Sequence, residues 1–184
     1  MKITILETSD IHAYVSTKSF TNPNKYENHS LSKVKTYIDE IKRENENVIY
    51  IDNGDSIQGS PLGTFYKNNN DLKNLAYVYN LLNPDAVILG NHDFNYGQDY
   101  LKSYINYLYA PVLSANTIDK NSFLDIRPYI IKNIENIKIG ILGLTTQYIP
   151  HWERPENIKG LSFKSALETA KYYLPILKNE EKCD

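Results

Sequence analysis

Three short apolar runs, each ending directly in a cluster of polar side chains, are the feature that most constrains the fold of this 184-residue chain. They span residues 3–8, 48–51 and 86–89, and they are rich in the β-branched residues that favour strands. Segments with apolar residues at helical spacing separate them. Strands that alternate with helices in this way predict a parallel sheet with right-handed crossovers. The polar clusters should therefore meet at the carboxyl edge of that sheet, where open α/β folds bind ligands.

The other elements follow from the same kinds of pattern. Helical spacing predicts helices over 30–45, 71–82, 97–109 and 165–177, and Pro61 suits the first turn of another. A short buried strand is expected over 112–115, and two apolar runs around Glu135-Asn136 predict a hairpin over 127–134 and 137–144. Polar, proline-containing sequence predicts irregular loops over 16–29 and 147–157.

Composition narrows the classes of function. The charged fraction of 23% and hydrophobic fraction of 41% are typical of a globular domain. A net charge of -2, with basic residues interspersed among acids, gives no nucleic-acid footprint. The sequence shows neither the run of roughly 20 apolar residues of a membrane helix nor a signal peptide, so we expect a cytoplasmic protein, with secretion open if a leader was removed. Cys183 is the one cysteine, which leaves no thiolate metal site within this chain.

The polar clusters carry side chains that suit a metal site. Asp10 and His12 follow the first run, Asp55 follows the second, and Asn91 and His92 follow the third. In extended backbone Asp10 and His12 would project to the same side. Such oxygen and nitrogen ligands bind Zn, Mn, Fe or similar divalent ions. Without a cation the two carboxylates would repel each other in a partly dry pocket. The alternative is ordinary strand-end capping and turn chemistry.

Two divalent metal ions would give these residues a hydrolytic chemistry. Ions roughly 3.5–4 Å apart can lower the pKa of water from about 15.7 towards 7 and hold phosphoryl oxygens for in-line displacement. A carboxylate such as Asp55 can bridge both ions. His92 could donate a proton to the leaving oxygen or stabilise charge on the phosphoryl group; a structural, hydrogen-bonding histidine is the alternative.

At these residues the chain resembles the metallophosphoesterase (calcineurin-like) superfamily, whose sequence blocks are D-x-H, G-D and G-N-H-D/E. They correspond here to Asp10-Ile11-His12, Gly54-Asp55 and Gly90-Asn91-His92-Asp93. Residues 52–62 and 90–97 look like the 5′-nucleotidase family, and most like its bacterial 2′,3′-cyclic-nucleotide 2′-phosphodiesterase/3′-nucleotidase branch. Residues 114–117 and the region around Trp152 also fit, so the resemblance spans nearly the whole chain.

The resemblance implies a role for each residue. Asp10 and His12 would bind the first metal, Asp55 would bridge, Asn91 would bind the second, and His92 would be the catalytic imidazole. The 5′-nucleotidases pair that imidazole with an aspartate three residues later, where this chain has Asn95. An amide oxygen can orient the ring but cannot supply charge to an imidazolium. In the cyclic-phosphodiesterase branch asparagine is the usual residue at this position, so the resemblance favours that branch over a plain 5′-nucleotidase.

Four further polar residues have two interpretations each. Gln58 could contact the substrate or stabilise its own loop, and Asn116 could approach the site or hold a turn. We expect Asp52 and Asp93 to support the site rather than to bind metal.

The family also implies an α/β/β/α sandwich, of which this chain would hold the N-terminal portion. Later histidines, including a G-H-x-H block, complete the family's metal site, and a C-terminal domain closes its nucleoside pocket. Neither is found within residues 1–184, and the chain stops straight after a predicted helix. We therefore expect the first part of a longer protein, and an isolated chain that binds metal weakly and hydrolyses little.

The sequence predicts a two-metal phosphoester hydrolase acting on nucleotides, in which an activated water attacks phosphorus. The nearest rival is another metallophosphoesterase, such as a nuclease. A second rival is a binding or regulatory module that keeps the fold without catalysis. A dinucleotide-binding domain is disfavoured because no G-x-G-x-x-G follows the first strand.

Overall fold

The central element of the structure, a computed structural model that describes residues 1–22 and 24–184, is a sheet of four parallel strands in chain order. The strands are β1 (Thr4–Thr8), β2 (Val48–Asp52), β3 (Ala86–Ile88) and β4 (Val112–Leu113). The predicted α/β class with a parallel sheet is confirmed. Pro23, part of the loop expected over residues 16–29, lies outside the described residues.

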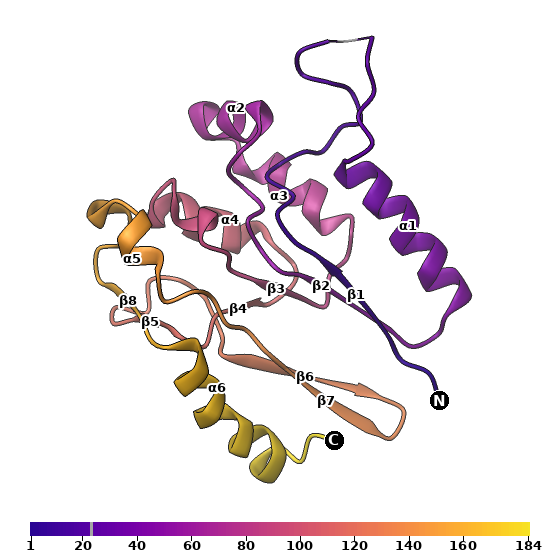
Figure 1. Cartoon of the computed structure of the whole chain (residues 1–184), viewed down its shortest axis with the longest axis vertical. Coiled ribbons are helices and arrows are strands. Elements are labelled where there is room, and N and C mark those ends of the chain that lie inside the picture. Colours follow the sequence, from indigo (N-terminus) through magenta and orange to yellow (C-terminus); the bar gives the residue numbers. More distant parts are fainter. Residues whose placement is uncertain (23) are drawn as a thin grey trace.

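Helices cover one face of this sheet (Figure 1). They are α1 (Leu31–Glu44), α3 (Leu72–Asn80) and α4 (Gln98–Tyr107), while α2 (Pro61–Asn69) follows the loop after β2. Ser30 and Ser60 cap α1 and α2 by accepting hydrogen bonds from backbone N–H groups, and Pro61 occupies the first turn as predicted. On β2, Tyr50 packs in one core cluster with Leu31 of α1 and Leu75 of α3.

The opposite face of the sheet packs against a hairpin of two antiparallel strands, β6 (Tyr129–Ile134) and β7 (Ile137–Leu142). Because side chains alternate along a strand, Ile49 joins Ile141 in a second core cluster, on the side away from Tyr50. Beyond the hairpin lies α6 (Ala166–Pro175), whose Tyr173 ring is 5.9 Å from that of Tyr129. Figure 1 shows the resulting order of layers: helices, parallel sheet, hairpin, helix.

The structure corrects two sequence predictions and adds one element that the sequence did not predict. The loop expected over 147–157 contains two short helices, α5 (Ile149–Trp152) and η2 (Pro155–Ile158), because Ile149 and Ile158 are buried in a third core cluster. The strand expected over 112–115 pairs with β3 over two residues only. The backbone N–H groups of Ser114 and Ala115 instead donate to the carbonyls of Arg127 and Gly143, which flank the hairpin. A small antiparallel sheet of β5 (Thr117–Asp119) and β8 (Leu161–Phe163) was not predicted.

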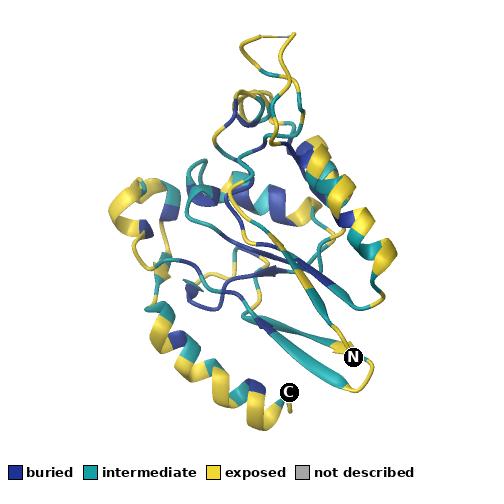
Figure 2. Ribbon diagram, turned by 45° about the vertical axis from the view of Figure 1, so that its right-hand side comes forward, coloured by how far each residue is buried: buried dark blue, intermediate teal, exposed yellow. Residues whose placement is uncertain are grey.

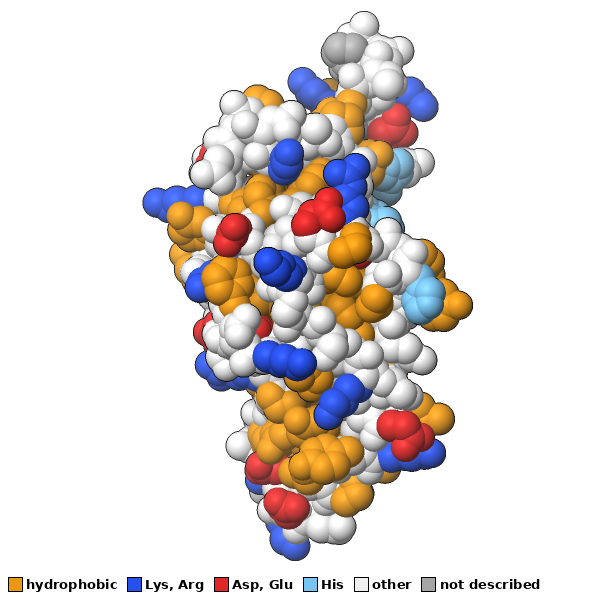
Figure 3. Space-filling model, turned by 90° about the vertical axis from the view of Figure 1, so that its left-hand side faces the viewer, with side chains coloured by type: hydrophobic (Ala, Val, Ile, Leu, Met, Phe, Trp, Pro, Cys, Tyr) orange, Lys and Arg blue, Asp and Glu red, His pale blue; other side chains and the backbone are white. Residues whose placement is uncertain are grey.

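Burial is deepest where the parallel strands lie. Figure 2 shows β2 and β3 largely dark blue, whereas the hairpin is mostly teal and α6 is mostly yellow, with Thr169 as its one buried residue. Within the described part of the chain, no helix is long and apolar enough to cross a membrane. On the face drawn in Figure 3, basic and acidic side chains are interspersed among hydrophobic ones.

Candidate metal and active site

The loops that follow β1 and β2 pair with each other beyond the ends of the strands. The backbone N–H groups of Asp10, His12 and Ala13 donate to the carbonyls of Gly54, Asp55 and Ser56, over 2.8–3.0 Å. Asp10, His12 and Asp55 have φ of 57°, 51° and 57°, a left-handed conformation in which Asp and His are enriched among non-glycine residues. The extended backbone expected for Asp10 and His12 is therefore wrong. The paired loops nevertheless bring both side chains together.

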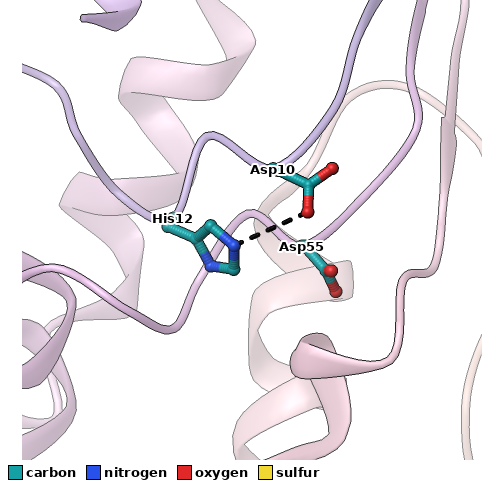
Figure 4. Close-up of side chains that lie close together, drawn as sticks. All are labelled: Asp10, His12 and Asp55. Atoms are coloured by element: carbon teal, nitrogen blue, oxygen red, sulfur yellow. Dashed lines mark ion pairs between the residues drawn. The ribbon is translucent and has the colours of Figure 1, made fainter. Parts of the chain in front are cut away.

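The side chains of Asp10, His12 and Asp55 converge, and we call these three residues the metal arm (Figure 4). One ligand atom from each lies within 4.8 Å of the other two. Nδ1 of His12 is 2.5 Å from the carbonyl oxygen of Gln58, which can only accept, so Nδ1 carries the proton. The lone pair of Nε2 is then free, 3.7 Å from Oδ1 of Asp10. Two carboxylates and an imidazole lone pair facing one point fit a divalent cation.

The loop after β3 touches the metal arm through Asp55. The backbone N–H of His92 donates to Oδ1 of Asp55 over 2.7 Å, and a Cβ built on Gly90 would lie only 2.3 Å from the same oxygen. Glycine at position 90 therefore allows this close approach. Asn91 stands between these two residues and lines a cavity beside His92. This is a position from which an amide oxygen could serve a second cation.

A second group, which we call the histidine arm, consists of His92, Asn95 and Glu153. Nδ1 of His92 lies 2.8 Å from Oδ1 of Asn95, and the amide nitrogen of Asn95 donates to a carboxylate oxygen of Glu153. The His92 ring is 5.2 Å from that of His12, in an edge-to-face arrangement. All three members line a cavity of about 500 Å³, together with Asn91, Ile149 and Trp152. Sequence reasoning missed Glu153, for which no local motif gives a signal.

Asp93 connects the loop after β2 to the loop after β3. Its carboxylate accepts hydrogen bonds from the backbone N–H groups of Asp55, Ser56, Ile57 and Gly90, over 2.9–3.4 Å. Burial, with a smaller contribution from the charge of Asp55, raises the pKa of Asp93 to about 6, although the backbone hydrogen bonds lower it.

Asp52 has a similar position at the end of β2. Its two carboxylate oxygens accept from the hydroxyl of Ser56, at 3.0 Å, and from the backbone N–H of Gly54, at 3.4 Å. Burial raises the pKa of Asp52 to about 7, against the lowering effect of the Ser56 hydrogen bond, and the charge of Asp93 adds to the rise. Both carboxylates thus organise the backbone of the loops that carry the metal arm.

The two side chains predicted to contact substrate have different surroundings. Asn116 is fully buried, and its amide group is used within the protein: Nδ2 donates to the carbonyls of Lys164 and Thr145, and Oδ1 accepts from the N–H of Thr145. These bonds give Asn116 a structural role. Gln58 is half-buried and contributes its backbone carbonyl to His12. A substrate contact by either side chain stays a prediction.

Comparison with known proteins gives relatives for nearly the whole chain. It is 30% identical to the 2′,3′-cyclic-nucleotide 2′-phosphodiesterase/3′-nucleotidase of Salmonella typhimurium, over 96% of this chain and 29% of the relative. It is 31% identical to the 5′-nucleotidase of Vibrio cholerae, over 100% of this chain and 32% of the relative. The chain thus spans about a third of the length of these two relatives.

The fold and the sequence profile agree with these relatives. The structure resembles that of a Staphylococcus aureus protein provisionally named a 5′-nucleotidase, with a TM-score of 0.92 and 37% identity, over 99% of this chain and 36% of that one. Residues 3–183 match the profile described as Calcineurin-like phosphoesterase. The D-x-H, G-D and G-N-H-D blocks predicted this result. The chain belongs to the calcineurin-like phosphoesterase family.

Proposed function

We propose that this chain carries the metal-binding loops of a phosphoester hydrolase that acts on nucleotides. One observation supports this most: the ligand atoms of Asp10, His12 and Asp55 converge within 4.8 Å of one another, next to a second histidine ring. Divalent cations bound at such a site would lower the pKa of water and neutralise charge on phosphoryl oxygens. The relatives' names, which specify nucleotide phosphoesters, support the same class of substrate.

In this proposal the chain's own residues have separate tasks. Asp10 and His12 would hold one cation, Asp55 would be shared, and the amide oxygen of Asn91 would serve a second. The hydrogen bond from the His12 ring to the Gln58 carbonyl fixes the imidazole so that Nε2 faces the carboxylates. The metals suited to these ligands are Mn, Zn, Fe or similar ions.

His92 is the residue proposed to act on the substrate itself. When the ring is protonated, Nδ1–H donates to Asn95 and Nε2–H is available to the leaving oxygen or to a phosphoryl oxygen. The cavity of about 500 Å³ beside His92 leaves room for a phosphate ester, and exposed Trp152 forms part of its wall. We propose a cyclic or linear mononucleotide as the occupant. A cytoplasmic location belongs to the same proposal.

The test compares substrates and one variant. The chain is supplied with Mn²⁺ and assayed, at high protein concentration because we expect slow turnover, against a 2′,3′-cyclic nucleotide, a linear nucleoside monophosphate and DNA. We expect hydrolysis of mononucleotides, and a loss of about 10²–10⁴-fold in turnover for His92→Ala, the usual contribution of acid–base catalysis. Preferential cleavage of DNA would favour the nuclease alternative. Metal binding without any hydrolysis would favour the regulatory module.

A further inference from the structure

Glu153 places a carboxylate where it can control the catalytic histidine indirectly. It lies directly after α5, on a segment that is remote from His92 in sequence but lines the same cavity. One carboxylate oxygen accepts from the amide nitrogen of Asn95, and Oδ1 of Asn95 in turn lies 2.8 Å from Nδ1 of His92. A continuous chain of hydrogen bonds therefore runs from an anion to the imidazole.

We propose that Glu153 is a positioning residue that fixes the tautomer of His92 by fixing the orientation of the Asn95 amide. The role in catalysis rests on the proposed function, whereas the control of the tautomer does not. A carboxylate can only accept hydrogen bonds, so it requires the NH₂ end of Asn95 to face Glu153. The oxygen end must then face His92, which places the proton of a neutral ring on Nδ1. Nε2 is left as the nitrogen available to the substrate.

The surroundings of Glu153 hold it in this role. Its other oxygen, Oε1, accepts from the backbone N–H of Arg154 at 2.7 Å and from Nδ2 of Asn157 at 2.9 Å. Nδ2 of Asn157 also donates to the backbone carbonyl of Asn95, so Asn157 joins both segments. Partial burial raises the pKa of Glu153, but the hydrogen bonds from Asn95, Arg154 and Asn157 together outweigh this effect. The net result is a pKa below the usual value of a glutamate. The carboxylate therefore stays ionised at neutral pH.

This arrangement supplies, one residue further away, the charge that position 95 lacks. An aspartate at that position would contact the imidazole directly, whereas here an amide transmits the preference of an anion behind it. The oxygen and the NH₂ group of the neutral Asn95 amide are similar in size, so the orientation of the amide depends on which hydrogen-bonding partner constrains it. Glu153 is that partner, and its replacement should change the proton position on His92 without removing any atom of His92 or Asn95.

Glu153→Gln is the sharpest variant because it changes one oxygen to NH₂ at almost constant shape. The Gln oxygen should occupy the Oε1 position, where it satisfies two donors, Arg154 N–H and Asn157 Nδ2. Its NH₂ group then faces Asn95, which must rotate its amide to avoid two opposed donors. Nδ2 of Asn95 would then donate to Nδ1 of His92, which favours the Nε2–H tautomer. Adding Asn95→Asp should reverse this, because the carboxylate introduced at position 95 accepts from both neighbours.

The tautomer is read directly by ¹⁵N–¹H correlation NMR of the histidine rings in this chain, without metal or substrate. The pH is set about two units above the ordinary histidine pKa of about 6.5, and the His92 signals are identified by their loss in His92→Ala. We expect the Nδ1–H tautomer in the wild type. In Glu153→Gln the ratio of Nε2–H to Nδ1–H should rise by about tenfold or more, the change expected from one hydrogen bond. In Asn95→Asp/Glu153→Gln the Nδ1–H tautomer should return. Glu156→Gln, an exposed control nearby, should match the wild type.

Two results would overturn the proposal: an Nε2–H ring in the wild type, or Nδ1–H retained in Glu153→Gln. A misfolded single variant does not remove the test, because the double variant restores complementary hydrogen bonding and has its own expected result. With Mn²⁺ and a mononucleotide, Glu153→Gln should lower kcat with little change in KM, and the double variant should recover part of it. If the wild type shows no hydrolysis while the tautomers behave as expected, the proposed function fails and the control by Glu153 stands.

Discussion

The metal arm and the histidine arm differ in what holds them in place. Backbone hydrogen bonds between two loops, with three residues in left-handed conformations, position Asp10, His12 and Asp55. One backbone hydrogen bond, from the N–H of Asn95 to the carbonyl of His92, holds the histidine arm locally, and side-chain hydrogen bonds connect the His92 ring through Asn95 to Glu153. Left-handed non-glycine residues cost of order 1–3 kcal/mol each and persist only where the surrounding structure enforces them. The metal arm should therefore be rigid, and the histidine arm should be adjustable by single substitutions.

Asp93 supports the loops that carry both arms, and its removal is the strongest test of the comparison. Asp93→Ala leaves four backbone N–H groups without their acceptor, including those of Asp55 and Gly90. We expect the free energy of unfolding, measured with urea, to fall by about 4 kcal/mol. Asp125→Ala, at an exposed position, should change it by less than about 0.5 kcal/mol. A loss for Asp93→Ala as small as that of the control would show that the loops are held together in some other way.

Asp52, at the foot of the metal arm, should make the stability of the metal-free chain depend on pH. Its pKa is about 7 in the folded state, above the 3.8 of a free carboxyl, so the folded state binds more protons between these values. The contribution of Asp52 to the free energy of unfolding is therefore lost as pH rises from about 4 to 7. Asp52→Asn lacks this loss, and relative to the wild type it should gain roughly 3 kcal/mol across that range. Urea unfolding in a chelator, at pH values spanning the range, measures the difference; parallel curves for the two proteins would contradict it.

The next variant should separate the two arms. Asp55→Asn keeps an oxygen that can accept from the N–H of His92 but removes the charge from the metal arm. We expect the affinity for Mn²⁺, measured by calorimetry, to fall by about 100-fold or more. Replacing residues that only support metal ligands lowers affinity by about 10–100-fold, and Asp55 is itself a proposed ligand. His92→Ala should keep the affinity within about threefold, because its side chain belongs to the other arm. An equal loss in both variants would mean that the arms form one unit.

The same difference explains what the sequence could predict. Asp10, His12 and Asp55 stand directly after strand-like runs, so local pattern and the shared edge of a parallel sheet were enough to bring them together. Asn91 and His92 follow the third strand-like run, so the same pattern placed them at this edge of the sheet. Which of these residues adopt left-handed φ could not be predicted, because Asp and His also fit extended backbone; the loop pairing beyond the strands decides it.

Glu153 could not be predicted because its partner, Asn95, is far away in the sequence. The short helices around it form because Ile149 and Ile158 are buried in the same core cluster as Phe94, and local propensity does not contain such tertiary packing. For Asn116 the sequence left two interpretations open, and the fold adds that its amide group is buried among backbone partners. Sequence pattern thus located the residues near strand ends, and long-range packing decided the rest.

The smallest expected effect probes the support of His12 within the metal arm. Gly59 has φ of 132°, and a Cβ there would lie 2.8 Å from Nδ1 of the His12 ring. Gly160 has φ of 88°, with its nearest neighbour, Nδ2 of Asn121, at 3.4 Å. Alanine should strain the backbone at either position, by roughly 1–2 kcal/mol, but only Gly59→Ala should push His12 away from the Gln58 carbonyl. We therefore expect Gly59→Ala to weaken Mn²⁺ binding by about tenfold, and Gly160→Ala to leave it unchanged at similar stability. Equal affinities in the two variants would show that the orientation of His12 does not limit metal binding, and that the metal arm is less rigid than its backbone pairing implies.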